Sequence, residues 1–277
     1  MLTLYDTGEE FLQDVNELWI MNDYVARGFF AKNCEQFGTL YQTDFAAHYS
    51  NYGGDILAIR QGSYPMFFAG DVEAVPDFVK ALSRTQYHVQ KVMAAKPLYE
   101  ALMKACPDNI VTGFDQKKDM LLMVHELPAI ARKNPNARHA EEQDVDAIVS
   151  LEKTFESLTN TQQFVAPSER PARVLENLKN YAVVEVNGEV VSMAKRTRDT
   201  EVACSISGVV THGYHTNKGY AQQVVDFLAQ EIIAEGKACY LFAEAQNMTA
   251  QHVYERINFM VKQTYVNAQL MGPRMYV

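Results

Sequence analysis

The spacing of apolar and polar residues divides the chain into regions of different texture. Up to about residue 50 the apolar residues recur at roughly helical intervals, which predicts a largely helical start. From residue 55 onward, short apolar runs alternate with amphipathic segments, as is typical of an α/β domain. Strands are predicted at 55–60, 64–69, 87–93 and 120–124, and helices at 75–82 and 97–104.

A second series of elements follows residue 136. Asn187 and Gly188 separate two β-rich runs, which predicts a hairpin with a type I′ turn. A helix connects the strands at 202–210 and 238–243, so this pair is expected to be parallel and its neighbours antiparallel. Further strands are predicted near 137–140, 181–186, 189–194 and 260–270, helices at 144–155, 171–178, 220–235 and 247–256, and a polar loop beside the site at 157–167.

The length of 277 residues allows two domains, each with its own core. The best candidate linker contains two prolines, two asparagines and adjacent basic residues. We therefore predict an N-terminal α/β domain at 1–127, a linker at 128–136 and a second domain at 137–277. The end of the first domain repeats the element order of residues 202–270, which favours a degenerate repeat; a generic α/β companion domain is the alternative.

Composition excludes several classes of protein. Thirty-four acidic and 25 basic residues give a net charge of −9, which disfavours binding to nucleic acid or to an anionic membrane surface. The sequence has no apolar run of membrane-spanning length, and its first residues lack the features of a secretory signal, so we predict a cytoplasmic protein. No CxxC pair occurs, so no metal site is predicted, and the cysteines are expected to be small buried hydrophobes: Cys34, Cys106, Cys204 and Cys239.

The turn before the helix at 220–235 is the strongest candidate for chemistry. An apolar strand ends near Val210, the backbone must turn at Lys218 and Gly219, and an amphipathic helix starts at once. Backbone N–H groups at the positive end of a helix dipole form a natural phosphate site. The alternative is an ordinary strand–helix unit in which the glycine only makes the turn.

Two motifs lie in this region, one at Thr216–Ala221 and one at Asn247, Ala250, Tyr254 and Phe259. Together they resemble the acetyl-CoA-binding core of the GNAT superfamily of N-acetyltransferases. The first falls on that family's pattern Gln/Arg-x-x-Gly-x-Gly/Ala, and the second on its later pattern Asn-x-x-Ala-x-x-x-Tyr-x-x-x-Gly-Phe. The resemblance covers roughly residues 137–270 and implies a mixed, mostly antiparallel sheet with a splayed parallel strand pair.

The chain departs from the family pattern at three positions. Thr216 replaces the usual Gln or Arg, Asn217 stands where a glycine often occurs, and Asn258 replaces the glycine of the Gly-Phe pair. The resemblance implies that the turn binds pyrophosphate mainly through backbone amides, so the first two changes are expected to weaken the phosphate site without removing it.

The resemblance also implies a role for individual residues toward acetyl-CoA as co-substrate. The pantetheine arm would lie between the splayed strands, with its thioester carbonyl polarised by the backbone. Asn247 would bond the arm, although it is equally a candidate helix cap. The residues implied for the arm are Val209, Val210 and Thr211, and those for the pyrophosphate turn are Thr216, Asn217, Lys218, Gly219, Tyr220 and Ala221.

Two residues are candidates for proton transfer. Tyr254 lies two helical turns after Asn247, and its hydroxyl would face the sulfur. The leaving thiol has a pKa of about 8.5 and tyrosine one of about 10, so Tyr254 is a plausible general acid, with a packing aromatic as the alternative. Glu244 is the candidate base, or else a solvated rim carboxylate. His212 and His215 are expected at the surface.

The sequence thus predicts an N-acetyltransferase that acts on a small-molecule amine by direct attack, which requires no catalytic cysteine. Two alternatives stay open: a GNAT-like protein that binds acyl-CoA without turnover, and a modifier of protein lysines or aminoacyl nucleic acids. The oligomeric state is not predicted.

Overall fold

The computed structural model describes residues 1–35, 44–62, 64–85, 89–106, 113–125, 128, 134–159 and 166–271. The chain divides into two compact units. Unit 1 comprises Met1–Leu122, Glu244–Gln246 and Lys262–Val277, and unit 2 comprises Met123–Ala243 and Asn247–Val261. Each unit therefore contains segments from both halves of the sequence. Most of the linker predicted at 128–136 lies outside the described residues, and the domain boundaries stay a prediction.

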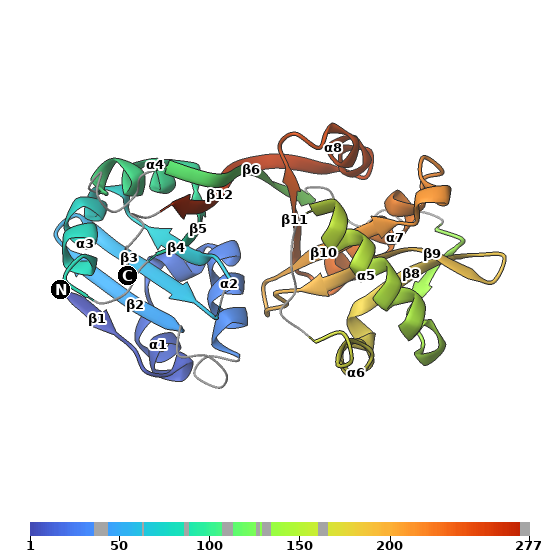
Figure 1. Ribbon diagram of the computed structural model, residues 1–277, viewed down its shortest axis with the longest axis horizontal. Coiled ribbons are helices and arrows are strands. Elements are labelled where there is room, and N and C mark those ends of the chain that lie inside the picture. Colours follow the sequence, from blue (N-terminus) through green and yellow to red (C-terminus); the bar gives the residue numbers. More distant parts are fainter. Residues whose placement is uncertain are drawn as a thin grey trace. The chain divides into compact units, whose positions relative to one another are not determined.

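Unit 1 is a sheet with helices on both faces (Figure 1). Its strand order is β1-β2-β3-β4-β5-β12-β6, in which β4 and β5 are parallel. The strands are β1 (Leu2–Leu4), β2 (Phe45–Asn51), β3 (Gly54–Arg60), β4 (Met66–Gly70), β5 (Lys91–Ala95), β6 (Gly113–His125) and β12 (Phe259–Met271). The helices are α1 (Gly8–Val15), η1 (Trp19–Asn22), α2 (Tyr24–Cys34), η2 (Val72–Ala74), α3 (Val75–Leu82) and α4 (Lys96–Ala105).

Both faces of the unit 1 sheet are buried. Successive strand side chains point to opposite faces, and Phe67 and Phe68 illustrate this in β4. The ring of Phe67 stacks on Phe29 of α2 with 4.2 Å between centroids. Phe68 instead joins the core beneath α3 and α4, which includes Phe78 and Leu102. The first part of this sheet was predicted incorrectly, because residues 45–51 form a strand and not a continuation of the helical start.

Unit 2 contains strands β11-β10-β9-β8-β7 and the helices that cover them. The strands are β7 (Ala137–His139), β8 (Tyr181–Val186), β9 (Glu189–Thr197), β10 (Ala203–Thr211) and β11 (Ala238–Glu244). The helices are η3 (Glu142–Asp144), α5 (Val145–Thr159), α6 (Arg170–Glu176), η4 (Leu178–Asn180), η5 (Gly213–His215), α7 (Tyr220–Ala234) and α8 (Met248–Glu255). Only β10 and β11 pair in parallel among the strand pairs described in this unit. The prediction of a mixed, mostly antiparallel α/β fold is confirmed.

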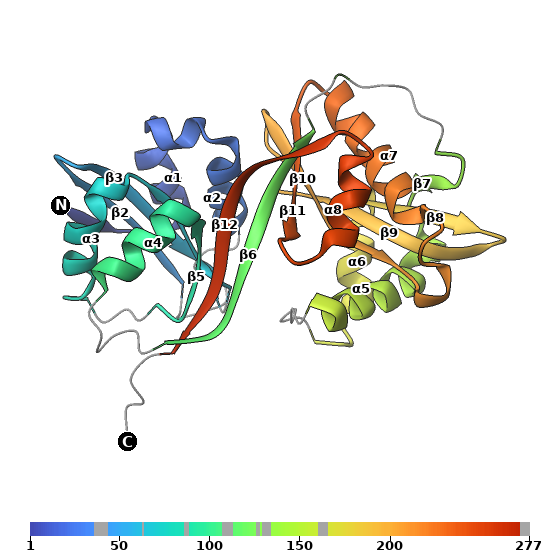
Figure 2. The ribbon, with the colours of Figure 1, turned by 90° about the horizontal axis from the view of Figure 1, so that it is seen from above.

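Helices α5 and α7 cover opposite faces of the unit 2 sheet (Figure 2). Val183, Met193 and Val210 belong to the core under α5. Ala182 and Ala194, which alternate with them, are buried on the face that α7 covers. The sheet is therefore fixed from both sides, and its strand ends are held in place for a site.

The Asn187–Gly188 hairpin is confirmed. Both residues have positive φ, 53° and 80°, as a type I′ turn requires. The turn joins β8 to β9, whose register runs from Val186↔Glu189 to Tyr181↔Lys195. The register shifts by one residue between Val184 and Glu185, so the turn sets the pairing beside it, and this shift sets the pairing farther along β9.

The two halves of the chain carry the same order of helices and strands. In the described residues, 3-10 turns aside, β1 to β6 and β7 to β12 both follow the order β-α-α-β-β-β-α-β-α-β. This order supports the predicted degenerate repeat, which stays a prediction.

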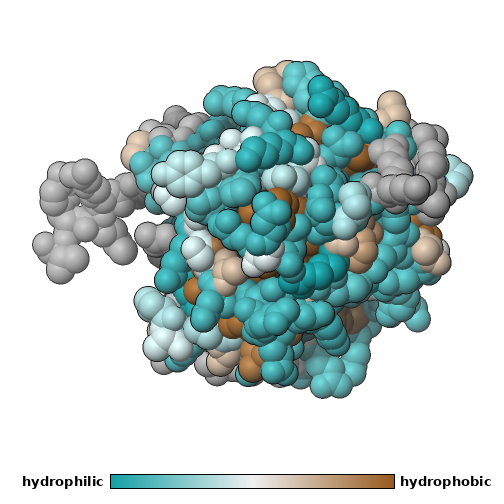
Figure 3. Space-filling view, turned by 90° about the vertical axis from the view of Figure 1, so that its right-hand side faces the viewer, coloured by the Kyte–Doolittle hydropathy of each residue, from teal (hydrophilic) through white to brown (hydrophobic). Residues whose placement is uncertain are grey.

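One face of the molecule is mostly polar. Figure 3 shows a mostly hydrophilic face on which hydrophobic residues form small separate patches. Scattered exposed apolar residues are normal for a globular protein. Among the described residues, no helix combines the length and hydrophobicity needed to cross a membrane.

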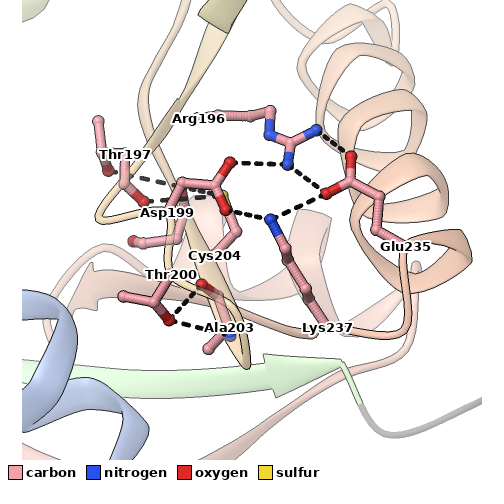
Figure 4. A network of polar contacts seen from close by, with 9 residues as sticks. Arg196, Thr197, Asp199, Thr200, Ala203, Cys204, Glu235 and Lys237 are labelled. Atoms are coloured by element: carbon pink, nitrogen blue, oxygen red, sulfur yellow. Dashed lines mark hydrogen bonds and ion pairs between the residues drawn. The ribbon is translucent and has the colours of Figure 1, made fainter.

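A polar network ties the β9–β10 turn to the end of α7 (Figure 4). Arg196 donates to Glu235 at 2.7 Å and to Asp199 at 2.8 Å. Lys237 pairs with Asp199 at 2.6 Å and with Glu235 at 3.1 Å. The hydrogen bond from Arg196 is the main cause that lowers the pKa of Glu235 to about 2.

This network is expected to make stability depend on pH in the acid range. Because the pKa of Glu235 is lower in the folded state than its ordinary 4.5, its contribution is complete above pH 4.5 and is lost as pH falls toward 2. Its side chain is 37% exposed, so solvent screening limits the effect to below about 1 kcal/mol. Urea unfolding of Glu235→Gln should show a deficit at pH 7 that disappears near pH 2. Replacement of the exposed Glu176 by Gln should show no such deficit.

Candidate active site

Strands β10 and β11 separate at their carboxyl ends. Their parallel register runs from Ala203↔Ala238 to Ile206↔Leu241. Beyond this pair, β10 continues to Thr211 and β11 to Glu244. The ends of two parallel strands therefore extend past their shared ladder, as the predicted wedge for a pantetheine arm requires.

A bulge lies where the two strands separate. The register between β10 and β9 shifts between Ser207 and Val210, and Gly208 within this interval has φ 62°. A bulge bends a strand and re-aims its neighbouring groups, and glycine accepts the positive φ. The bulge thus affects Val209, Val210 and Thr211, the residues predicted to bond the arm.

The turn before α7 has the features of an anion site. Gly219 precedes the helix with φ 80°, and no side chain caps the helix there. Asn217, which stands where the family often has glycine, also has positive φ, 61°. Asparagine adopts positive φ more readily than most other residues. A Cβ placed on Gly219 would meet no atom within 4 Å.

The backbone N–H groups of this turn, the dipole of a 15-residue helix and the open space together fit a diphosphate. Thr216 has a short side chain, and its hydroxyl donates to the Gly213 carbonyl at 3.1 Å. It therefore leaves this space open, which the Gln or Arg usual at this position would not. Lys218 is exposed, and Tyr220 and Ala221 form the first turn of α7.

Asn247 and Tyr254 are both on α8. The Asn247 Oδ1 accepts from the Ala250 N–H at 3.0 Å, so Asn247 caps the helix. This bond leaves its Nδ2 group available for a ligand, and the residue is exposed. Cap and ligand roles are therefore compatible.

Tyr254 is 7% exposed, and its burial raises the pKa of the phenol. No partner among the described residues bonds its hydroxyl. From the sequence, the pKa of the phenol was expected to lie close to that of the leaving thiol. Burial widens the difference between these two pKa values. Tyr254 stays protonated and can donate a hydrogen bond to a sulfur atom, but it is a weaker acid than an exposed tyrosine.

Glu244, the candidate base, forms an ion pair. Lys118 of β6 donates to its Oε1 at 2.5 Å, and each side chain is about one-third exposed. Beside this pair, the Ala245 N–H donates to the Asp119 carbonyl at 2.8 Å. Because the Lys118 ammonium group is bonded to Oε1, an amine substrate that approached this oxygen would compete with Lys118 for it.

The cysteines of this unit are inert. Cys204 and Cys239 are fully buried, and burial raises the pKa of both thiols, that of Cys204 to about 11. The prediction of small buried hydrophobes holds for these two, while Cys34 and Cys106 are partly exposed. The described residues contain no group of three His, Cys, Asp or Glu side chains arranged to hold a metal.

His212 helps to line a cavity of about 560 Å³ and is partly exposed. The cavity is also lined by Arg138, which pairs with Asp144 and Glu185 at 2.6 Å. Arg138 thus bonds both carboxylates. The residues that line this cavity do not include those predicted for the wedge.

Sequence reasoning missed a buried ionic cluster next to the bulge. Lys195 of β9 donates to Glu152 of α5 at 2.7 Å, and the Tyr181 hydroxyl donates to the same oxygen at 2.8 Å. Lys195 holds the pKa of Glu152 below its ordinary value despite burial. The only sequence signals were a glutamate on the inward face of a helix and a glycine inside a strand, which is typical of a bulge.

Comparisons with known proteins agree with this geometry. Residues 185–267 match the family model described as FR47-like protein. No match was found among curated protein sequences.

Solved structures resemble the whole chain. A GCN5-related N-acetyltransferase from Sphaerobacter thermophilus shares 13% identity, with a TM-score of 0.61 over 100% of this chain and 97% of its own. A GNAT-family acetyltransferase from Colwellia psychrerythraea shares 12% identity, with a TM-score of 0.61 over 98% and 100%. A Drosophila protein shares 11% identity, with a TM-score of 0.66 over 98% of both chains. At these identities the similarity establishes the fold, and the resemblance to the GNAT superfamily is confirmed at that level.

Proposed function

We propose that this chain, whose fold is that of GNAT acetyltransferases, transfers an acetyl group from acetyl-CoA to the amine of a small molecule. The observation that carries the proposal is the parallel pair β10–β11, whose ladder ends at Ile206 and Leu241 while both strands continue. A linear thioester ligand fits such a wedge. The uncapped turn at Gly219 offers a diphosphate site at the end of one of these strands.

The proposed roles follow from the groups present. Backbone groups at Val209, Val210 and Thr211 hold the arm and polarise the thioester carbonyl, which makes it more susceptible to attack. The N–H groups from Asn217 to Ala221 bind the diphosphate, and Asn247 donates from Nδ2. Acetyl-CoA supplies the activated acyl group, and Tyr254 stabilises the leaving sulfur.

Two measurements test this function in sequence. Calorimetry with acetyl-CoA tests the binding site, and thiol release across a panel of small amines tests turnover. Acetyl-CoA binding with amine-dependent thiol release supports the proposal. Absence of binding at millimolar ligand contradicts it.

A non-catalytic acyl-CoA-binding protein is the second candidate. The Lys118–Glu244 ion pair favours this alternative, because it neutralises the one carboxylate proposed as base. Acetyl-CoA binding without thiol release on any amine would identify this function. A modifier of proteins or aminoacyl nucleic acids would instead release thiol only with a macromolecular acceptor.

Tyr254→Phe is expected to lower kcat by about a hundredfold, the lower end of what a positioned acid contributes. The hydroxyl is the only group lost, so the dissociation constant for acetyl-CoA should change by less than about twofold. Thiol-release kinetics and calorimetry measure the two effects. An unchanged kcat at every pH would show that Tyr254 only packs beside Phe259, whose ring centroid lies 6.2 Å away.

A further inference from the structure

The bulge at Gly208 is covered by the side chain of Lys195. A Cβ placed on Gly208 would lie 3.4 Å from Cε, 3.5 Å from Cγ and 3.7 Å from Cδ of this lysine. These are ordinary van der Waals distances. The lysine stem therefore fills the space beside the bulge on the face that α5 covers.

The end of this side chain is fixed. Its Nζ lies 2.7 Å from Glu152 Oε1 and 3.3 Å from the Tyr181 hydroxyl, and 5.2 Å from the Tyr181 ring centroid. The side chain of Lys195 is 17% exposed and that of Glu152 is 6% exposed. A lysine usually has great rotamer freedom, but one whose end is bound by two buried groups keeps its stem in one place.

The inner end of the wedge is closed as well. Ile206 and Leu241, the last paired residues of β10 and β11, are 2% and 1% exposed. If the thioester carbonyl lies at Val209 to Thr211, this closed end and Lys195 bound the space beside the acyl group on two sides. Of these two boundaries, Lys195 is the one made by a single side chain that can be shortened.

We propose that Lys195, held by Glu152 and Tyr181 across Gly208, is the wall that restricts the site to short acyl groups. This inference rests on the proposed function, since it assumes that acyl-CoA binds in the wedge. The volume of the lysine stem limits the length of the acyl group, and the ion pair with Glu152 holds the stem in position.

Two double variants separate volume from charge. Glu152→Gln accompanies each lysine substitution, because a buried carboxylate that has lost its partner destabilises the fold. Glu152→Gln/Lys195→Met keeps the long stem without the charge, and Glu152→Gln/Lys195→Ala removes both. The exposed Lys179→Ala serves as a control for the loss of a lysine elsewhere in unit 2, and thermal unfolding verifies that every variant is folded.

The readout is the dissociation constant of acetyl-, butyryl- and hexanoyl-CoA, measured by calorimetry, together with relative kcat/KM from thiol release. The wild type, the methionine variant and Lys179→Ala are expected to bind acetyl-CoA at least tenfold more tightly than hexanoyl-CoA. In the alanine variant, the ratio of the hexanoyl-CoA to the acetyl-CoA dissociation constant is expected to be about tenfold smaller than in the wild type.

Each other outcome overturns the proposal. Equal relaxation in the methionine and alanine variants would assign the effect to the charged end and its ion pair and not to the volume of the stem, and no relaxation in either would place the limit elsewhere. A wild type that binds all three thioesters equally well would remove the Lys195 inference alone. A wild type that binds none of them would instead reject the proposed function, and this inference with it.

Discussion

Gly219→Asp is expected to weaken acetyl-CoA binding by about a hundredfold relative to Gly219→Asn. Both side chains are of similar size, and both residues tolerate the positive φ of 80° found at this position. They differ in charge, and a carboxylate beside the N-terminus of α7 would repel a diphosphate held there. A hundredfold change corresponds to about 2.7 kcal/mol, within reach of two like charges a few ångströms apart near a protein surface.

Calorimetry of both variants at low salt measures this difference. A Cβ at Gly219 meets no atom within 4 Å, so neither substitution should alter packing, and both melting temperatures should agree. Raising the ionic strength should narrow the gap between the variants. If both bind acetyl-CoA equally well at low salt, the diphosphate is not bound at this turn.

A chain that ends at Val261 is expected to lose the folded core of unit 1. The deletion removes the part of β12 that pairs with β5, from Tyr265↔Ala95 to Gln269↔Lys91. It also removes Val266, Ala268 and Leu270 from the core, where they are 0%, 1% and 9% exposed. Burial of two large aliphatic side chains stabilises by about 3–6 kcal/mol, a large part of the 5–15 kcal/mol typical of a domain.

Urea unfolding and limited proteolysis measure the loss, which should appear as rapid cleavage within residues 45–106. A chain that ends at Met271 is the matched control and should unfold like the full chain. Should the chain that ends at Val261 keep its protection, β12 would be dispensable to unit 1. That result would also favour the domain boundary predicted at 137, since residues 137–277 would then fold apart from the first half.

Elements specified by neighbouring residues were predictable, and those specified by distant partners were not. The Asn187–Gly188 turn and helix α3 depend on local sequence, and both were placed correctly. Strand β2 was missed because its run Phe-Ala-Ala-His-Tyr contains two alanines, which favour a helix until β3 provides a pairing partner.

The candidate site divides in the same way. The turn at Gly219 and the cap at Asn247 follow from short motifs, and the structure contains both. The Glu152–Lys195 pair joins residues 43 positions apart and has no local signature. The bulge at Gly208 has only a weak one, a glycine inside a strand, because its position depends on the register with β9. The ion pair of Glu244 with Lys118 spans 126 positions, and sequence reasoning therefore treated Glu244 as a free carboxylate.

The burial of Tyr254 has a consequence for the shape of any pH–rate profile. A phenol that stays neutral far into the alkaline range cannot produce a decline in rate between pH 8 and 10. The rise in rate on the acidic side of the profile would then report deprotonation of the amine nucleophile itself. The midpoint of this rise should shift with the pKa of each amine in a series. The proposed activity would then reach a plateau at high pH and would not follow a bell-shaped curve.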